Sequence, residues 1–234
     1  MVGPVLGSSL VIAAGAMAYA VRGRSSTLVA PSVYRGNSSR AALALTFDDG
    51  PSESTPELLE VLERFDVRAT FFQCGIHVRR LPDVARAVLA AGHEIGNHTD
   101  QHRPLCLLTF REIREELQRA QESIVAVTGS VPTLFRAPYG IRWFGLAGAQ
   151  RRLKLTGVMW TTIARDWTLP ADGIVERVMG GARNGAIFCL HDGRGRLKRP
   201  DIQPTIKAIR ECVPRLRDRG FQFETVSQLL CPAT

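Results

Sequence analysis

Short apolar runs alternate along this chain with segments of helical periodicity, and this alternation restricts its possible folds more than any other feature. Seven runs are predicted to be buried strands, at 41–47, 69–74, 94–97, 133–136, 157–160, 186–190 and 221–225. The helices are expected from Thr55, over 82–91, behind Thr109, near 143–152, 173–182 and 203–219, and at 226–230. Strands that alternate with helices of about ten or more residues form parallel βαβ units. The pattern predicts an α/β fold, and about seven units suit a closed or nearly closed barrel, with an open doubly wound sheet as the alternative.

Three parts of the chain are distinguished by their composition. Residues 1–21 carry no charged side chain and are strongly apolar over 11–21. A membrane-spanning helix needs about 20 apolar residues, so we predict an apolar membrane anchor over 1–21, although Pro4 and several glycines and serines dilute it. The polar segment 22–40 is predicted to be a linker, and 41–234 to be one globular domain.

Charge and cysteine content narrow the classes of partner. The net charge of +8 is compatible with an anionic polymer, an anionic membrane surface or nucleic acid, but a well-solvated, arginine-rich surface is the simpler interpretation. No basic run is interleaved with aromatic residues, so we expect no nucleic-acid partner. The five cysteines include no C-x-x-C pair, and we predict no disulfide framework.

Two polar clusters follow predicted strands and could form a metal site. Asp48 and Asp49 come at the end of the first strand, where Gly50 and Pro51 break it, although Asp-Asp-Gly-Pro alone is often only a turn. His98 and His102 follow the third strand, and histidines four apart on a helical turn can bind one metal ion. Such spacing also arises by chance. With Asp49 as a third ligand, the set would leave a coordination position open for water, as catalytic zinc sites do.

Three further clusters are weak when each is taken alone. Arg136-Ala-Pro-Tyr139 follows a strand, where an arginine can fix a carboxylate through two parallel hydrogen bonds. Asp166 next to Trp167 could be a carboxylate beside an aromatic wall, or a packed tryptophan with a surface aspartate. His191 lies just past a buried strand, where a lone histidine is more often structural than catalytic.

Taken together, the five clusters resemble the polysaccharide deacetylases of carbohydrate esterase family 4, the NodB-homology domain. The resemblance covers about residues 40 to 230 and keeps the order of the family's motifs. These motifs are Thr46-Phe-Asp-Asp-Gly50, His98-Thr-x-x-His102, Arg136-x-Pro-Tyr139, Asp166-Trp167 and His191-Asp192. Any one of them is common, but all five in this order are hard to obtain by chance.

The resemblance implies a distorted (β/α) barrel whose active site lies at the carboxyl ends of the strands. It implies a divalent metal, usually zinc, with cobalt or nickel as substitutes, held by Asp49, His98 and His102. It also implies that Asp48 is the general base and His191 the general acid. Arg136 would orient the base and would in turn be tethered by Asp166.

The resemblance assigns four further residues to substrate binding: Pro138, Tyr139, Trp167 and Cys189. The backbone N–H of Tyr139 would stabilise the oxyanion, and Trp167 would form a wall of the acetyl pocket. Cys189 stands where the family commonly has leucine, which predicts a wider methyl pocket. Ile163 stands where an aspartate is often found, which puts part of a hydrogen-bond network in doubt.

The expected activity is removal of acetyl groups from N-acetylhexosamine residues of a polysaccharide, oligosaccharide or glycoconjugate by a monomeric enzyme. Action on O-acetyl esters or on another C–N amide bond is one alternative. An inactive, membrane-anchored glycan-binding module is another. The resemblance places the domain outside the cytoplasm, whereas Arg22 and Arg24 after the apolar segment favour a cytoplasmic domain, because positive residues tend to stay inside.

Overall fold

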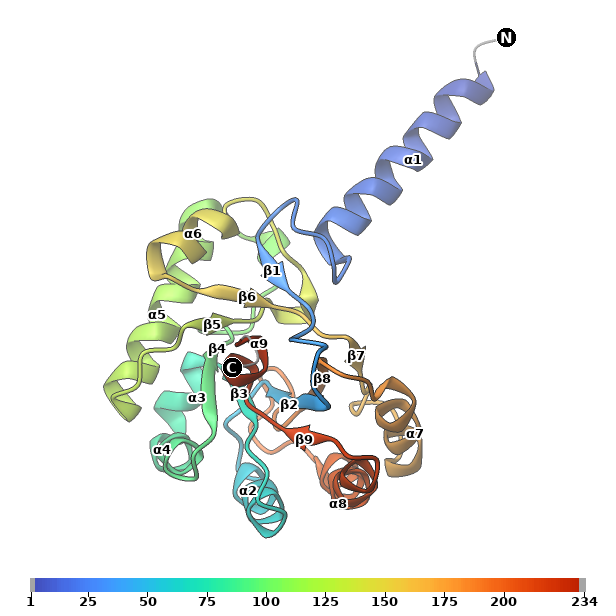
Figure 1. Cartoon of the computed structure of the whole chain (residues 1–234). Coiled ribbons are helices and arrows are strands. Elements are labelled where there is room, and N and C mark those ends of the chain that lie inside the picture. The colour runs from blue at the N-terminus through green and yellow to red at the C-terminus, as the bar shows by residue number, and fades with distance from the viewer. Residues whose placement is uncertain (1–2, 232–234) are drawn as a thin grey trace.

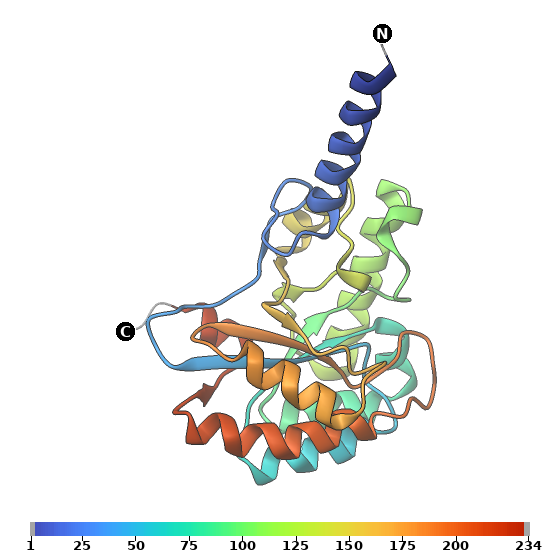
Figure 2. The same cartoon turned by 90° about the vertical axis from the view of Figure 1, so that its right-hand side faces the viewer.

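The computed structural model describes the backbone of residues 3–231 and the side chains of residues 13–231. The described chain forms one curled sheet, with most helices on its outer face and α1 projecting away from it (Figures 1 and 2). All strand pairs in the sheet are parallel. The strands are β1 (Ser32–Val33), β2 (Ala42–Asp48), β3 (Thr70–Gln73), β4 (Glu94–Asn97), β5 (Leu134–Phe135), β6 (Thr156–Val158), β7 (Thr162–Ile163), β8 (Ala186–His191) and β9 (Gln222–Phe223).

Nine α-helices and two short 3-10 turns are found within the described residues. The helices are α1 (Gly3–Arg22), α2 (Thr55–Arg64), α3 (Gly75–Arg80), α4 (Pro82–Ala90), α5 (Phe110–Thr128), α6 (Leu146–Leu153), α7 (Ala171–Gly181), α8 (Gln203–Asp218) and α9 (Val226–Leu230). The 3-10 turns are η1 (Leu105–Leu107) and η2 (Pro138–Gly140).

The sheet is a curled half-barrel. Its strand order is β1-β6-β5-β4-β3-β2-β8-β7, with β9 pairing to β2, and no pairing joins β7 to β1 in the part of the chain that the structure describes. Helices α2, α4, α5, α7 and α8 surround the outer face, whereas α9 lies in the hollow (Figure 1). The prediction of a parallel α/β fold of the NodB type is confirmed. The doubly wound alternative is wrong, because that fold would place layers of helices on both faces.

Alternation along the strands separates an outer core from an inner one. On β2, Leu43, Leu45 and Phe47 pack outward against the helices, as Phe188 does on β8. The residues between them face the hollow, where a second cluster includes Ala42, Ala44, Ile187 and, from α9, Val226 and Leu229. Because successive side chains point to opposite faces, this register also directs Thr46 and Asp48 on β2, and Cys189 and His191 on β8, into the hollow.

The N-terminal part differs from its predicted division. Among the residues whose side chains are described, no helix has both the length and the apolar character needed to cross a membrane. The anchor predicted over 1–21 therefore finds no support here, and residues 1–12 of it lie outside the described side chains. The predicted linker 22–40 contains β1, which pairs with β6. Arg142 donates to Ser32 Oγ at 2.7 Å and to the Gly23 carbonyl, so part of this segment is docked on the domain.

The structure contains every predicted strand but also elements that the sequence did not predict. All seven predicted strands are present, and the helix expected behind Thr109 begins with a capping box formed by Thr109 and Glu112. Strands β1 and β7 were missed because two residues show no periodicity. The helix expected from Thr55 begins at that residue, with Ser54 at the N-cap, and the Thr55 hydroxyl donates to Asp192 Oδ2 at 2.7 Å.

Candidate active site

Asp48 and Asp49, at the end of β2, make different contacts because the backbone changes conformation between them. Asp48 is the last residue of β2 and points into the hollow, paired in register with His191 of β8. Asp49 follows in the left-handed conformation, with φ of 73°, which aspartate adopts more readily than most residues. The turn separates the two side chains, so they form different contacts at the same end of the sheet.

The two histidines after β4 converge through a loop, and the helical turn predicted for them is absent. Thr99 and His102 both have positive φ, 65° and 54°. The loop is held by buried polar groups: Glu116 Oε2 accepts from the N–H groups of Asp100 and Gln101 at 3.1 and 2.8 Å. Because those backbone donors are satisfied from α5, the loop can hold both imidazoles beside Asp49.

Asp49, His98 and His102 form a compact set of metal-donor atoms. Asp49 Oδ1 lies 3.2 Å from His98 Nε2 and 2.9 Å from His102 Nε2. One donor atom from each residue lies within 4.8 Å of the other two, and all three residues are buried. His98 Nδ1 donates to the Arg136 carbonyl at 2.8 Å, which leaves its Nε2 lone pair free toward the carboxylate.

These residues fit a divalent cation such as zinc. Asp49 Oδ1 is buried without a hydrogen-bond partner although it faces two imidazoles. An orphaned buried carboxylate oxygen is costly, and a cation between the three donors would satisfy it. One carboxylate with two imidazoles is also a donor set seen in catalytic zinc sites, which keep one position open.

The other oxygen of Asp49 is held by a second loop. Gly195 N–H donates to Asp49 Oδ2 at 2.6 Å, and the Gly195 carbonyl lies 2.6 Å from His77 Nε2. Burial alone would raise the pKa of Asp49, but the adjacent imidazoles of His102 and His98 outweigh it and hold that pKa well below its usual range. His77 thus supports a metal-site carboxylate through the backbone of one glycine.

Arg136 fixes Asp48, as predicted. Its Nη1 donates to Asp48 Oδ1 at 2.7 Å and to Thr46 Oγ1 at 2.6 Å. The guanidinium is fully buried, and its remaining nitrogens donate to the Val158 and Met159 carbonyls at 3.2 Å each. Because all three nitrogens are engaged, the position of the carboxylate is fixed.

Asp166 does not tether Arg136, so that prediction is wrong. Asp166 Oδ1 lies 2.7 Å from His191 Nδ1, and its Oδ2 accepts from the His191 N–H and from Thr205 Oγ1 at 2.9 and 2.7 Å. The left-handed turn at Arg165 (φ 57°) directs Asp166 back toward β8. Burial would lower the pKa of His191, but the charge and hydrogen bond of Asp166 outweigh it and raise that pKa to about 9.

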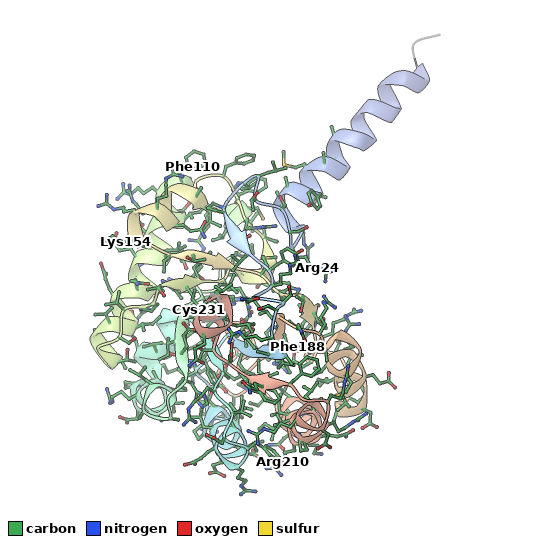
Figure 3. All side chains as sticks on the ribbon, in the orientation of Figure 1. Arg24, Phe110, Lys154, Phe188, Arg210 and Cys231 are labelled. Atoms are coloured by element: carbon green, nitrogen blue, oxygen red, sulfur yellow. The ribbon has the colours of Figure 1, made fainter. Side chains whose placement is uncertain are left out.

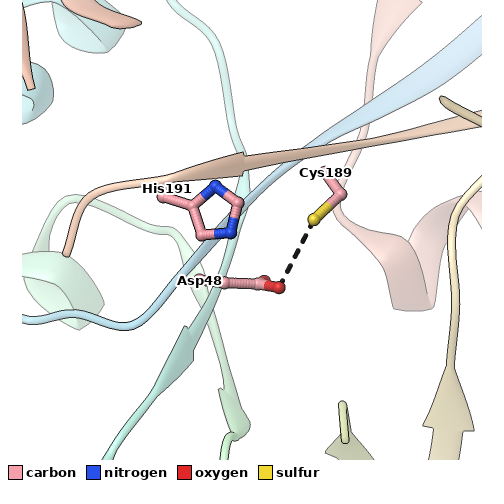
Figure 4. Close-up of side chains that lie close together, drawn as sticks. All are labelled: Asp48, Cys189 and His191. Carbon is pink, nitrogen blue, oxygen red and sulfur yellow. Dashed lines mark hydrogen bonds between the residues drawn. The ribbon is translucent and has the colours of Figure 1, made fainter. Parts of the chain in front are cut away.

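A second set of possible metal ligands consists of Asp48, Cys189 and His191 (Figure 4). Cys189 Sγ donates to Asp48 Oδ2 at 3.4 Å. Burial and the nearby Asp48 charge raise the pKa of the Cys189 thiol well above its usual value. Since metals bind the thiolate and Asp48 is already paired with Arg136, this set is a poorer metal site than the aspartate–histidine triad.

The triad opens into a cavity of about 780 Å³. Both predicted aromatic residues lie on its wall: the Tyr139 ring packs edge-on against His102, with centroids 4.7 Å apart, and that of Trp167 against His191, with centroids 5.1 Å apart. Cys189 and Ile163 also line it. Pro138, predicted to bind substrate, is buried and does not line the cavity; it directly precedes Tyr139 in η2.

Sequence reasoning missed three supporting residues. His77, Glu116 and Thr205 are not among the site residues that the sequence predicted. Each contacts a site loop from an element 15 to 118 residues away in the chain. A helical glutamate or an isolated histidine has no local sequence signal that predicts such contacts.

The fold and site define a class: α/β half-barrel proteins with an aspartate–histidine–histidine metal triad at the carboxyl ends of the strands. The family model described as polysaccharide deacetylase matches residues 35–158. The chain belongs to the polysaccharide deacetylase family.

Relatives and solved structures agree with this membership. The chain is 36% identical to a chitooligosaccharide deacetylase of Bradyrhizobium over 84% of its own length and 94% of that protein. It is similar to a crystal structure of a peptidoglycan N-acetylglucosamine deacetylase, with TM-score 0.79, 30% identity, and 84% and 91% of the two chains covered. It is also similar to a family pseudoenzyme from Bacillus anthracis, with TM-score 0.78, 28% identity, and 87% and 69% covered. Because the family includes a pseudoenzyme, membership alone does not establish catalysis. That conclusion depends on the residues of the site.

Proposed function

We propose that this protein is a metal-dependent hydrolase that removes acetyl groups from N-acetylhexosamine residues of a polysaccharide, oligosaccharide or glycoconjugate. One observation carries the proposal: a metal-donor triad, an arginine-fixed carboxylate and an aspartate-paired histidine face one cavity. The names of the relatives, chitooligosaccharide and peptidoglycan N-acetylglucosamine deacetylases, support the choice of substrate.

Asp49, His98 and His102 would hold the cation, for which zinc is the proposed identity and cobalt or nickel are alternatives. A divalent cation in such a site supplies Lewis acidity toward the acetyl oxygen and the attacking water. Asp48 is proposed as the base that takes the proton of this water. Its Oδ1 is engaged by Arg136, and among the described residues its Oδ2 accepts only from the weak Cys189 donor.

His191 is proposed as the acid that protonates the departing nitrogen. An amide nitrogen leaves poorly as an anion, so cleavage needs a positioned proton donor. With a pKa of about 9, the His191 imidazole carries its proton at neutral pH. Asp166 binds Nδ1, so the proton available to the substrate is the one on Nε2.

Three cavity residues are proposed to bind the acetyl group. The Tyr139 N–H would donate to the developing oxyanion, an interaction typically worth about 2.7–4 kcal/mol. The left-handed backbone at Tyr139 (φ 58°) sets the direction of this peptide. Trp167 and Cys189 would bound the acetyl methyl group, since both line the cavity.

Acetate release tests this function. We expect acetate from tetra-N-acetylchitotetraose or from peptidoglycan fragments, and little from O-acetylated xylan. Acetate from xylan alone would favour the O-acetyl esterase alternative. No acetate from any of these substrates, with zinc, cobalt or nickel supplied, would contradict the proposal and favour the inactive glycan-binding module.

The location of the domain is a separate proposal. The substrates named for the relatives favour a domain outside the cytoplasm, whereas Arg22 and Arg24 favour the inside. We propose the extracytoplasmic side. A phosphatase reporter fused to the C-terminus, active only outside, should be active; a silent phosphatase with an active cytoplasmic reporter would contradict it.

A further inference from the structure

Four arginines surround the cavity above the metal-donor triad. The cavity is lined by Arg22, at the end of α1, by Arg165, and by Arg194 and Arg196 of the loop after β8. None of the four forms an ion pair with a carboxylate within the described side chains, residues 13–231.

The carboxylates of the cavity do not neutralise these arginines. Asp48 is already paired with the fully buried Arg136, and Asp49 faces the two imidazoles of the triad. Arg194 is fixed in place, because its Nη2 donates to the Asp166 carbonyl at 2.9 Å. The cavity rim that these four arginines form therefore carries an excess of positive charge, which faces any ligand that enters the cavity.

The basic lining continues into an adjacent groove of about 430 Å³. The cavity and the groove share Trp160 and Ile163 as a common wall. One carboxylate, that of Glu176, lines this groove. Three further arginines line it as well: Arg24, Arg177 and Arg183.

Two of the groove arginines are held against its wall by backbone contacts. Arg177 Nε donates to the Ile163 carbonyl at 2.9 Å, and Arg24 donates to the Thr161 carbonyl. Each therefore keeps other N–H groups for a ligand. Arg24 lies at the foot of α1 (Figure 3), which puts the groove at the same end of the domain as Arg22.

We propose that the substrate is an anionic N-acetylated glycan, with carboxylates or phosphates, whose chain runs from the cavity across Trp160 and Ile163 into the arginine-lined groove. The inference rests on the proposed deacetylase function and specifies its substrate class. Guanidinium groups bind carboxylate and phosphate through paired hydrogen bonds. Seven arginines along one continuous path, opposed by one free carboxylate, favour a chain with repeated negative charge over a neutral one.

A matched pair of substrates tests the charge preference. One is a peptide-free tetrasaccharide of alternating N-acetylglucosamine and N-acetylmuramic acid, and the other is the same molecule with its carboxylates methyl-esterified. We expect kcat/KM to be at least about tenfold higher for the acid at low ionic strength, and the advantage to shrink with added salt, because salt screens exposed charges. A parallel pair, tetra-N-acetylchitotetraose with and without a reducing-end phosphate, distinguishes phosphate from carboxylate as the anion.

Single variants locate the contacts. Arg196→Gln in the cavity rim and Arg183→Gln in the groove should each lower the acid-to-ester ratio about two- to fivefold, the range expected for one exposed charge contact. The matched control is Arg210→Gln on α8, on the far side of the domain from Arg24 (Figure 3), which should leave the ratio unchanged.

Different results would contradict the anionic-glycan inference and the proposed deacetylase function. Acetate from none of these substrates would overturn the proposed function. Acetate released with equal kcat/KM from the acid and the ester, and likewise from the phosphorylated and plain chitotetraose, would overturn only the anionic-glycan inference. A ratio that falls as much in Arg210→Gln as in Arg183→Gln would overturn the proposed path through the groove.

Discussion

Replacing Asp166 by asparagine should shift the alkaline limit of activity, because Asp166 keeps His191 protonated. Asp166 Oδ1 lies 2.7 Å from His191 Nδ1, and both groups are buried from solvent to a large extent. Asparagine keeps the size of the side chain and removes its charge. Burial, which lowers the pKa of His191, would then act without the opposing carboxylate.

The magnitude follows from the pKa of His191. That pKa is about 9 in the folded protein, against an ordinary value of 6.5. Each pKa unit is worth 1.36 kcal/mol, so the surroundings of His191 stabilise its protonated form by roughly 3 kcal/mol net of burial, with Asp166 as the largest favourable contribution. At pH 8 a histidine with a pKa near 9 is about nine-tenths protonated, and one with a pKa of 6.5 about 3%. The variant should therefore lose about 30-fold in kcat/KM at pH 8 and progressively less toward pH 6.

The assay is the pH dependence of kcat/KM for acetate release, which reports the ionisation of the free enzyme. The wild-type protein should lose activity as pH rises through about 9, and the variant as pH rises through 6.5 or below. Asp172→Asn, at the exposed start of α7, is the matched control and should keep the wild-type profile. An equal loss at every pH, with the alkaline limit of activity unchanged, would show that Asp166 does not keep His191 protonated and has only a structural role.

Four further predictions follow from single contacts. Asp48→Asn should still bind zinc in a calorimetric titration but lose about 100-fold or more in kcat, as loss of a positioned base does; near-normal kcat would contradict its role. His98→Ala should abolish zinc binding in the same titration, and unchanged affinity would contradict its place in the triad. His77→Ala should weaken zinc affinity by about 10- to 100-fold, the usual effect of losing an outer-shell partner, whereas unaltered affinity would show that the Gly195 loop is held without it. Phe188→Ala, fully buried on β8, should lower the free energy of unfolding by about 3–5 kcal/mol, measured by urea denaturation, and a loss below 1 kcal/mol would contradict its place in the outer core.

The sequence predicted the parts of the site that depend on strand alternation and motif order. Asp48 and His191 end two strands whose apolar residues alternate, so the register places both in the hollow. The metal-donor triad was predicted by the same motifs. These features are local, and each can be inferred from a few consecutive residues.

Contacts across the chain were not predictable in the same way. Asp166 pairs with His191 and not with Arg136, because a left-handed turn at Arg165 sets its direction. The convergence of His98 and His102 depends on positive φ at Thr99 and His102, which their spacing does not encode. Backbone turns of this kind are determined by tertiary contacts, such as those from Glu116 on α5.

A stoichiometric metal titration of activity shows whether one metal ion, held by the Asp49, His98 and His102 triad, is needed for acetate release. Protein stripped of metal with a chelator would receive zinc in steps, and acetate release from tetra-N-acetylchitotetraose would be followed at each step. We expect no activity before addition and a linear rise that ends at one equivalent per chain, with no rise in His98→Ala. Acetate release that persists after chelation, or that rises equally in His98→Ala, would contradict this expectation.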